Sequence, residues 1–112
     1  MKPIALVLLN YNGIELLKKF LNNVISNSLE ADIVLIDNNS IDNSVKWFKK
    51  QHPKLQCIEL KENFGFAKGY NEGLKQVKYE YYGLLNTDVW VPKNWLKPLL
   101  KSFDTYPNAA II

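Results

Sequence analysis

The sequence predicts an α/β fold in which helices cover both faces of a mostly parallel sheet. Short runs of consecutive apolar residues, typical of strands buried on both faces, alternate along the chain with segments whose apolar residues recur at helical spacing. Such alternation implies right-handed crossovers between parallel strands. The 112 residues are enough for one core, so we expect residues 1–112 to form a single domain.

Two predicted strands and one predicted helix occupy the first part of the chain. Residues 4–9 form a continuous apolar run, which the polar residues 10–13 end. Apolar side chains at helical spacing then predict a helix over residues 14–25. Residues 33–36 predict the second buried strand, and residues 37–42 form a loop that can supply helix caps.

The middle of the chain is predicted to contain a short helix, the third strand and a longer helix. The short helix is marked by three apolar residues, Val45, Trp47 and Phe48. Pro53 ends it, because proline cannot continue a helix. Residues 55–60 predict the third strand, and the glycine-rich residues 63–73 lead into a helix that reaches about residue 78.

The last part of the chain predicts a strand, a helix and the start of another strand. Residues 81–85 form the fourth strand, and Pro92 suits the first turn of the following helix. The apolar face of that helix comprises Trp95, Leu96, Leu99, Leu100 and Phe103. Pro107 ends it, and residues 109–112 begin a fifth strand that breaks off early. We therefore expect the chain to be the N-terminal portion of a larger domain.

Composition narrows the classes of function. The chain is 47% hydrophobic and 22% charged, which is ordinary for a soluble globular domain. Its longest apolar runs are far shorter than the ~20 residues that cross a bilayer. The apolar stretch near its N-terminus is also too short for a signal peptide. We expect a cytoplasmic protein whose membrane contact is at most peripheral, at the inner face of the plasma membrane. All 14 basic residues are lysines, which disfavours a nucleic-acid partner because base and phosphate recognition relies on arginine.

A single cysteine and a single histidine offer little chemistry. Cys57 alone excludes an intrachain disulfide and a multi-cysteine zinc site. It lies within a predicted strand, so we interpret it as a packed core thiol. His52 precedes Pro53 near a helix end, where a capping or solvated role is the simpler interpretation.

Residues with amide, carboxylate or aromatic side chains lie beyond the carboxyl end of each predicted strand. They are found within residues 10–12, 37–39, 63–65 and 86–88. In an open parallel sheet these ends meet at one edge, where ligands bind at the point at which strand order reverses. The opposite edge offers mainly residues typical of solvated turns. The sequence therefore predicts one binding crevice at the carboxyl edge.

The side chains at this edge suit a nucleotide diphosphate. Tyr11 offers a flat face to a base, and Asp37 can accept hydrogen bonds from base or ribose. Asn86 can reach ribose or a metal-bound water, and Asp88 is a hard oxygen ligand for Mg²⁺ or Mn²⁺, which usually take one or two carboxylates plus phosphates. Simpler roles stay open: Tyr11 could only pack, Asp37 and Asn39 could cap a helix, and residues 86–88 could form a turn.

Three glycines recur every four residues, at Gly65, Gly69 and Gly73, and share one helical face. Each glycine inside a helix costs ~1 kcal/mol against alanine, so the pattern needs a reason. Close packing of helix on sheet and close approach to a ligand both explain it. The spacing differs from the dinucleotide-binding fingerprint, and the chain has no phosphate-binding loop of the Gly-x-x-x-x-Gly-Lys type.

Four stretches in order carry a resemblance to a known family. They are VLLNYNG at 7–13, VLIDNNSIDNS at 34–44, ENFGFAKGYNEG at 62–73 and LLNTDVWVPKNWL at 84–96. The sequence resembles the inverting family 2 glycosyltransferases, and within them the rhamnosyltransferase-like branch. The resemblance implies the Rossmann-like nucleotide-binding half of the GT-A fold, and transfer of a sugar from a nucleotide diphosphate to an acceptor hydroxyl.

The resemblance also implies roles for individual residues. Tyr11 and its neighbours would line the base pocket, and Asp37 would bind the nucleobase edge. Residues 86–88 would be the Asp-x-Asp element, with Asp88 and Asn86 at Mg²⁺ or Mn²⁺. The full set expected to bind the nucleotide sugar is Asn10, Tyr11, Asn12, Asp37, Asn39, Asn63, Gly65, Lys68, Asn71, Asn86, Thr87 and Asp88.

The implied partners are a UDP-, dTDP- or GDP-linked sugar and a saccharide or lipid-linked acceptor. The catalytic base of such enzymes lies later in the chain than Ile112, so we expect this segment alone to be inactive. Two positions depart from the family pattern: Asn86 replaces the first acid of Asp-x-Asp, and Tyr70 stands where many relatives have arginine.

Other functions remain open at this point. A non-catalytic α/β module could dock a partner through its exposed aromatic residues. A receiver-like phospho-acceptor domain is disfavoured, because it would need acids after the first strand, where this chain has Asn10, Tyr11 and Asn12. A nucleotidyltransferase would normally show a loop rich in glycine and arginine at the same place.

Overall fold

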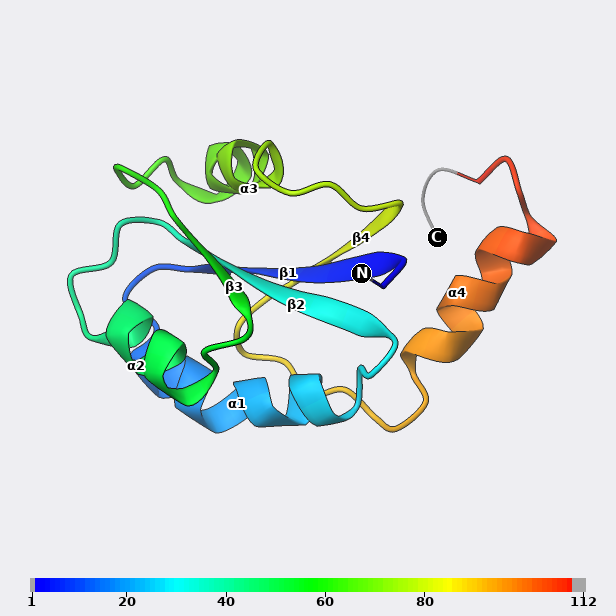
Figure 1. Ribbon diagram of the computed structural model, residues 1–112, viewed down its shortest axis with the longest axis horizontal. Helices are drawn as coiled ribbons and strands as arrows, with labels where there is room; N and C mark the ends of the chain where they lie inside the picture. The colour runs from blue at the N-terminus through cyan, green and yellow to red at the C-terminus, as the bar shows by residue number, and fades with distance from the viewer. Residues whose placement is uncertain (1, 110–112) are drawn as a thin grey trace.

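The computed structural model describes residues 2–109 and shows an α/β fold built on one parallel sheet (Figure 1). Its strands are β1 (Ile4–Asn10), β2 (Ala31–Asp37), β3 (Gln56–Glu59) and β4 (Tyr81–Leu85). They lie in the order β3-β2-β1-β4, and every neighbouring pair is parallel. The predicted fold class is therefore confirmed.

Helices cover both faces of this sheet. They are α1 (Ile14–Ser26), α2 (Ser44–Gln51), α3 (Phe66–Leu74) and α4 (Leu96–Thr105). Figure 1 shows α3 on one side of the sheet and α1 and α2 on the other. The chain runs from β1 through β2 to β3 in one direction and then returns across the sheet to β4, so right-handed crossovers place α3 on the opposite face.

The core consists of two clusters, one on each face, because alternate strand residues point to opposite sides. On one face Leu6, Leu8 and Leu35 pack with residues of α1, α2 and α4, including the fully buried Phe48. On the other face, the strands pack against Tyr70 and against residues that follow α3. Each fully buried leucine contributes about 1.5–3 kcal/mol by leaving water.

Two predicted helix boundaries are wrong. The third helix ends at Leu74 and not near residue 78. Turn hydrogen bonds follow it, such as that from Gln76 N to Gly73 O, and they place Val77 in the core. Pro92 precedes the last helix, which begins only at Leu96. Its first turn contains Pro98 instead, at a position where the missing N–H would have no helical partner.

Strand boundaries differ by smaller amounts from the predictions. The second strand extends to Ala31 at its start and includes Asp37, while the third is shorter than the predicted residues 55–60. The predicted fifth strand over residues 109–112 lies outside the described residues except for Ala109. Among residues 2–109, no helix has the length and apolarity that crossing a membrane requires.

The sheet splits at its carboxyl edge. The pairing of β1 with β4 ends at Leu8 and Leu85, whereas the pairing of β1 with β2 continues to Asn10 and Asp37. The strand order reverses on either side of β1, which is the position where open α/β sheets bind ligands. The residues that follow β1, β2 and β4 are therefore the candidates for a site.

Candidate functional site

A buried polar network joins the carboxyl ends of β1 and β2. The Asn10 side-chain amide donates to Asp37 Oδ1 at 2.8 Å and to Ser44 Oγ at 2.8 Å. Ser40 donates to Asp37 twice, from its hydroxyl to Oδ1 at 2.7 Å and from its backbone N–H to Oδ2 at 2.8 Å. Asn10 is 1% exposed and Asp37 is 2% exposed, so this carboxylate is satisfied by hydrogen bonds within the chain.

Two asparagines shape the loops above this network. Asn12 and Asn39 both adopt positive φ, of 51° and 63°, which asparagine tolerates better than most residues. Asn12 N donates to Ser40 Oγ at 2.8 Å, and Asn12 Oδ1 accepts from Ile41 N at 2.8 Å. The loops after β1 and β2 therefore hold each other in place. Both asparagine side chains are exposed at the carboxyl edge.

Asp42 fastens the same loop to two helices. Its carboxylate accepts from Ile14 N at 3.1 Å at the start of α1, and from the backbone and hydroxyl of Ser44 at the start of α2. Burial acts to raise the pKa of Asp42, but these hydrogen bonds outweigh it and hold the pKa below its usual value. The carboxylate is thus stabilised where helix N-termini favour negative charge.

The loop from β3 to α3 is held by Asn38, which follows β2. Asn38 Nδ2 donates to Gly65 O at 2.8 Å, and Asn38 Oδ1 accepts from Phe64 N at 3.0 Å. Asn63 Oδ1 accepts from Gly65 N at 2.9 Å, so this predicted site residue shapes the turn. Lys68 lies with its ammonium 4.9 Å from the centre of the Phe64 ring.

Glycine occupies the three spaced positions for two different physical reasons. A Cβ at Gly73 would lie 2.2 Å from Ile36 Cδ1, and one at Gly69 would lie 2.9 Å from Asn38 Nδ2. These two glycines let α3 pack closely on the sheet. Gly65 is exposed and has no neighbour within 4 Å of a built Cβ, but its φ of +80° favours glycine. Asn71 lies on the exposed side of α3.

Tyr70 lies where β1 and β4 separate. Its side chain is 4% exposed, and its hydroxyl donates to Leu85 O at 3.0 Å, at the last residue of β4. Burial raises the pKa of Tyr70, and a hydrogen bond with the Leu9 backbone opposes that rise only in part. The hydroxyl is therefore neutral and lies between the two strand ends.

Asn86, Thr87 and Asp88 follow β4 on the other side of β1 from Asp37. Asn86 and Asp88 are exposed, and Thr87 is half-buried. Both ion pairs found among residues 2–109 lie elsewhere, so Asp88 has no cationic side chain as a partner there. The two exposed side chains are free to offer oxygen atoms to a ligand.

These oxygens fit a hard cation that also binds phosphate. The part of the chain that the structure describes contains no cluster of three or more His, Cys, Asp or Glu side chains that could hold a metal by themselves. Mg²⁺ is commonly held by one or two carboxylates together with substrate phosphates and waters. Asp88, with the amide oxygen of Asn86, could supply that smaller protein share.

Most of the predicted site residues thus follow strands at the carboxyl edge, although in two different states, while Lys68 and Asn71 lie on α3. Tyr11 is 50% exposed and does not belong to the core, which leaves its ring available to a ligand. Asp37 and Asn10 are buried and bonded to their neighbours. Sequence reasoning did not single out Ser40 and Ser44, which complete the network, or Asn38, which holds the loop from β3 to α3. The polar stretch 37–44 was visible, but its hydrogen-bond partners depend on the tertiary fold.

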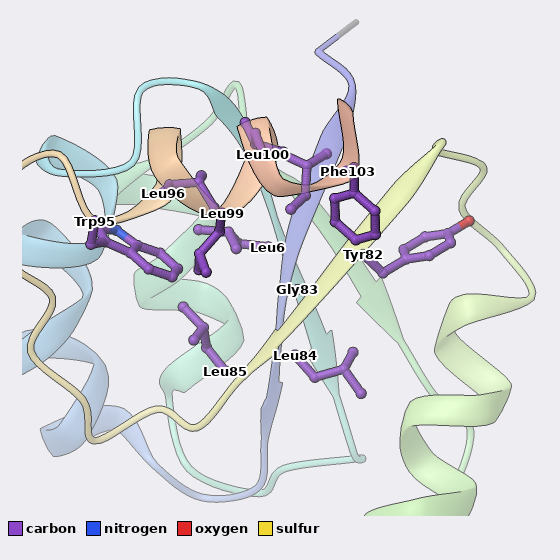
Figure 2. A pocket seen from close by; sticks show the side chains of 11 residues that line it. Leu6, Tyr82, Gly83, Leu84, Leu85, Trp95, Leu96, Leu99, Leu100 and Phe103 are labelled. Carbon is purple, nitrogen blue, oxygen red and sulfur yellow. The ribbon is translucent and has the colours of Figure 1, made fainter. Parts of the chain in front are cut away.

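An apolar hollow of about 420 Å³ lies elsewhere, between β4 and α4 (Figure 2). Its walls include Leu6, Leu85, Trp95, Leu99 and Phe103. None of the predicted site residues lines it. Polar groups that could orient a nucleotide are concentrated at the carboxyl edge instead. We therefore choose the candidate site by its polar side chains and not by the volume of the hollow.

Cys57 and His52 stay outside this site. Burial raises the pKa of the Cys57 thiol to about 11, and the nearby Glu59 carboxylate acts in the same direction. A thiol with so high a pKa is a poor nucleophile at neutral pH. Burial lowers the pKa of His52, whose ring lies beside Trp47 and Phe48.

Comparison with known sequences gives a family match across almost the whole chain. The sequence profile of Glycosyl transferase family 2 matches residues 5–112. Poly-beta-1,6-N-acetyl-D-glucosamine synthase of Staphylococcus epidermidis is 30% identical over 97% of this chain and 27% of its own length. The Staphylococcus aureus protein of the same name is 27% identical over 100% of this chain and 28% of its own length. The chain therefore spans under a third of the length of these relatives.

Solved structures agree with this match. Residues 1–349 of Staphylococcus aureus TarS, in complex with UDP-GlcNAc, match with a TM-score of 0.80 and 25% identity over 96% of this chain and 32% of that chain. The mannosyltransferase PcManGT from Pyrobaculum calidifontis, in complex with GDP-Man and Mn²⁺, matches with a TM-score of 0.73 over 98% of this chain and 33% of that chain. Its 19% identity supports the shared fold alone.

Proposed function

Because the chain belongs to Glycosyl transferase family 2, we propose that it binds the nucleotide-sugar donor of a glycosyltransferase at the carboxyl edge of its sheet. The reaction served is inverting transfer of a sugar from a nucleotide diphosphate to an acceptor hydroxyl. The observation that carries this proposal is the pair of exposed oxygen-bearing side chains, Asn86 and Asp88, beside the point where β1 and β4 separate.

Each wall of the crevice has its own role in this proposal. Tyr11 presents its exposed ring to the base, next to the loops that Asn12 and Asn39 hold in shape. Both oxygens of Asp37 accept hydrogen bonds from Ser40 or Asn10, so Asp37 supports the base pocket. Its Oδ2 can accept at most one more hydrogen bond, from a ligand. Its contact with the nucleobase edge stays a prediction.

Asp88 and Asn86 hold the divalent cation, Mg²⁺ or Mn²⁺, against the diphosphate. When bound, the cation neutralises charge that develops on the departing nucleoside diphosphate. The chain contains no arginine that could do so instead. Residues 2–109 supply the carboxylate and the amide oxygen, and the general base that deprotonates the acceptor belongs to chain beyond Ile112 in this proposal.

UDP-linked N-acetylglucosamine is the first donor to test. The TarS structure contains UDP-GlcNAc, and the curated relatives are named for a polymer of N-acetyl-D-glucosamine. These comparisons give no support to rhamnosyl transfer, so the rhamnosyltransferase-like branch remains a prediction from motif likeness. A saccharide or lipid-linked acceptor completes the proposed reaction.

Calorimetry with UDP, dTDP and GDP, each with and without Mn²⁺, tests the proposal. We expect at least one nucleotide to bind in a Mn²⁺-dependent way, and Asp88→Ala to weaken that binding about tenfold or more because the carboxylate ligand is lost. Asp104→Ala removes another exposed carboxylate, on α4, and should leave binding unchanged. A folded chain that binds none of the three nucleotides would contradict the proposal and favour a non-catalytic interaction module.

A further inference from the structure

We propose that Tyr70 is a positioning residue that sets the geometry of the cation-binding segment, residues 86–88, by tethering the end of β4. This inference rests on the proposed function. Tyr70 itself is buried and touches no ligand site directly. It acts through the backbone of Leu85, which immediately precedes Asn86.

The tether lies at the last pair of the sheet ladder. Pairing between β1 and β4 stops at Leu8 and Leu85, so the Leu85 carbonyl is the point at which β4 leaves the sheet. The Tyr70 hydroxyl adds a bond to this carbonyl at 3.0 Å from the side of α3. One hydroxyl therefore links α3 to the end of β4 at the point where β1 and β4 diverge.

The position of this hydroxyl is fixed by α3. Gly69 and Gly73 bring the helix so close to the sheet that a Cβ at either position would collide with Asn38 or Ile36. The Phe66 ring packs edge-on against Tyr70 with centroids 5.2 Å apart. Tyr70 is thus held from both sides, which is what a positioning group requires.

A second tether fixes the far end of the same segment. Val91 N donates to Asn23 Oδ1 at 2.7 Å, and Val91 O accepts from the side-chain amides of Asn23 and Asn27 at 3.1 and 2.9 Å. Residues 86–90 are therefore a short span held at Leu85 by α3 and at Val91 by α1. Loss of either tether frees one end of the span that carries Asn86 and Asp88.

Tyr70→Phe tests the proposal, because it keeps the ring and removes only the hydroxyl. In the presence of UDP, we expect the Mn²⁺ concentration for half-maximal binding to rise about tenfold, as it does when groups that orient metal ligands are removed. UDP affinity at saturating Mn²⁺ should stay within about twofold of wild type, since those contacts are not altered. A general loss of structure would instead weaken both.

Tyr82→Phe is the matched control. The Tyr82 hydroxyl also donates to a backbone carbonyl, that of Val77, at 3.0 Å, but at the opposite edge of the sheet. Amide hydrogen exchange gives a second readout that needs no ligand: exchange at residues 86–88 should rise about tenfold in Tyr70→Phe and not in Tyr82→Phe. Circular dichroism confirms that each variant is folded.

Either of two binding results would overturn the positioning role while leaving the proposed function intact. They are an unchanged Mn²⁺ midpoint in Tyr70→Phe, and an equal shift in Tyr82→Phe. If the wild-type chain binds no nucleotide, the proposed function fails and the role of Tyr70 toward a cation fails with it. Unchanged amide exchange at residues 86–88 would show that the hydroxyl does not tether the segment at all.

Discussion

Asp37 shows how a nearly inaccessible carboxylate can be accommodated without a cationic side chain. Burying an unpaired charge is costly, yet each oxygen of Asp37 accepts hydrogen bonds, from the Asn10 amide and from the hydroxyl and backbone N–H of Ser40. Because the donors come from β1 and from the loop after β2, the carboxylate links two segments distant in sequence.

Replacing Asp37 with alanine is expected to lower the free energy of unfolding by about 1–3 kcal/mol, because the Asn10 amide and the Ser40 N–H lose an acceptor while buried. Urea denaturation followed by circular dichroism measures the change. Glu62→Ala, at an exposed site, should change the free energy of unfolding by less than about 0.5 kcal/mol. Equal effects of the two substitutions would show that the network contributes nothing to stability.

The sequence predicted that Asp37 and Asp88 lie at the carboxyl edge of the sheet, but it did not predict their hydrogen-bond partners. Polar residues after a buried strand indicate the carboxyl edge, and Asp37 and Asp88 do lie at that edge on either side of β1. Whether a carboxylate there faces solvent or its neighbours depends on loop conformation. Asp37 is buried and Asp88 exposed, although both lie within three residues of the end of an apolar run.

At the scale of elements, α3 illustrates how glycine spacing sets the distance between helix and sheet. The helix follows the shortest strand and has no acidic residue in its first turn and no side-chain cap. Its stability therefore depends on packing rather than on its ends. Gly69 and Gly73 are required by that packing, whereas Gly65 precedes the helix and is explained by its positive φ.

Gly73→Ala should destabilise the chain by about 1–3 kcal/mol despite the better helix propensity of alanine, because its Cβ would overlap three side-chain atoms of Ile36. Thermal and urea unfolding measure this change. Combining it with Ile36→Ala removes the obstructing atoms, so the double variant should be more stable than the sum of the single effects predicts. Additive effects would show that no overlap exists.

Helix ends were the least predictable feature of the elements. The apolar residue Val77 predicted that α3 continues to about residue 78. Val77 instead packs in the core from the turn that follows the helix. Proline is common in the first turn of helices, so Pro92 predicted a helix start there. The chain instead adopts a positive φ of 59° at Asn94, and α4 begins only at Leu96. Both errors arise because tertiary packing, which a single sequence does not display, decides where the helix stops.

For the whole molecule, the alternation of strands and helices predicted the class correctly, and right-handed crossovers account for the faces that α1, α2 and α3 occupy. The strand order itself came only from the structure. That order leaves β4 at one side of the sheet, paired with β1 alone among the strands of residues 2–109.

This free edge carries apolar side chains next to the hollow below α4. Leu84 is 53% exposed, and Tyr82 is also exposed on the same face of β4 (Figure 2). Exposed apolar edge strands pair readily with other chains, so we expect the 112-residue chain to self-associate as its concentration rises. Leu84→Lys should reduce this association in sedimentation velocity without unfolding the chain. Leu29→Lys, which alters an even more exposed leucine in a turn, should leave it unchanged.

The contrast between the two walls of the crevice has a thermodynamic consequence. Several mutually supporting hydrogen bonds preorganise the wall made by β1 and β2. A ligand that binds there therefore causes little loss of conformational entropy in that wall. The wall after β4 is held by hydrogen bonds at Leu85 and Val91 and by the packing of Val89 and Trp90, so residues 86–88 lose more conformational entropy when the crevice is filled. The ordering penalty of association therefore falls almost wholly on one short span of backbone.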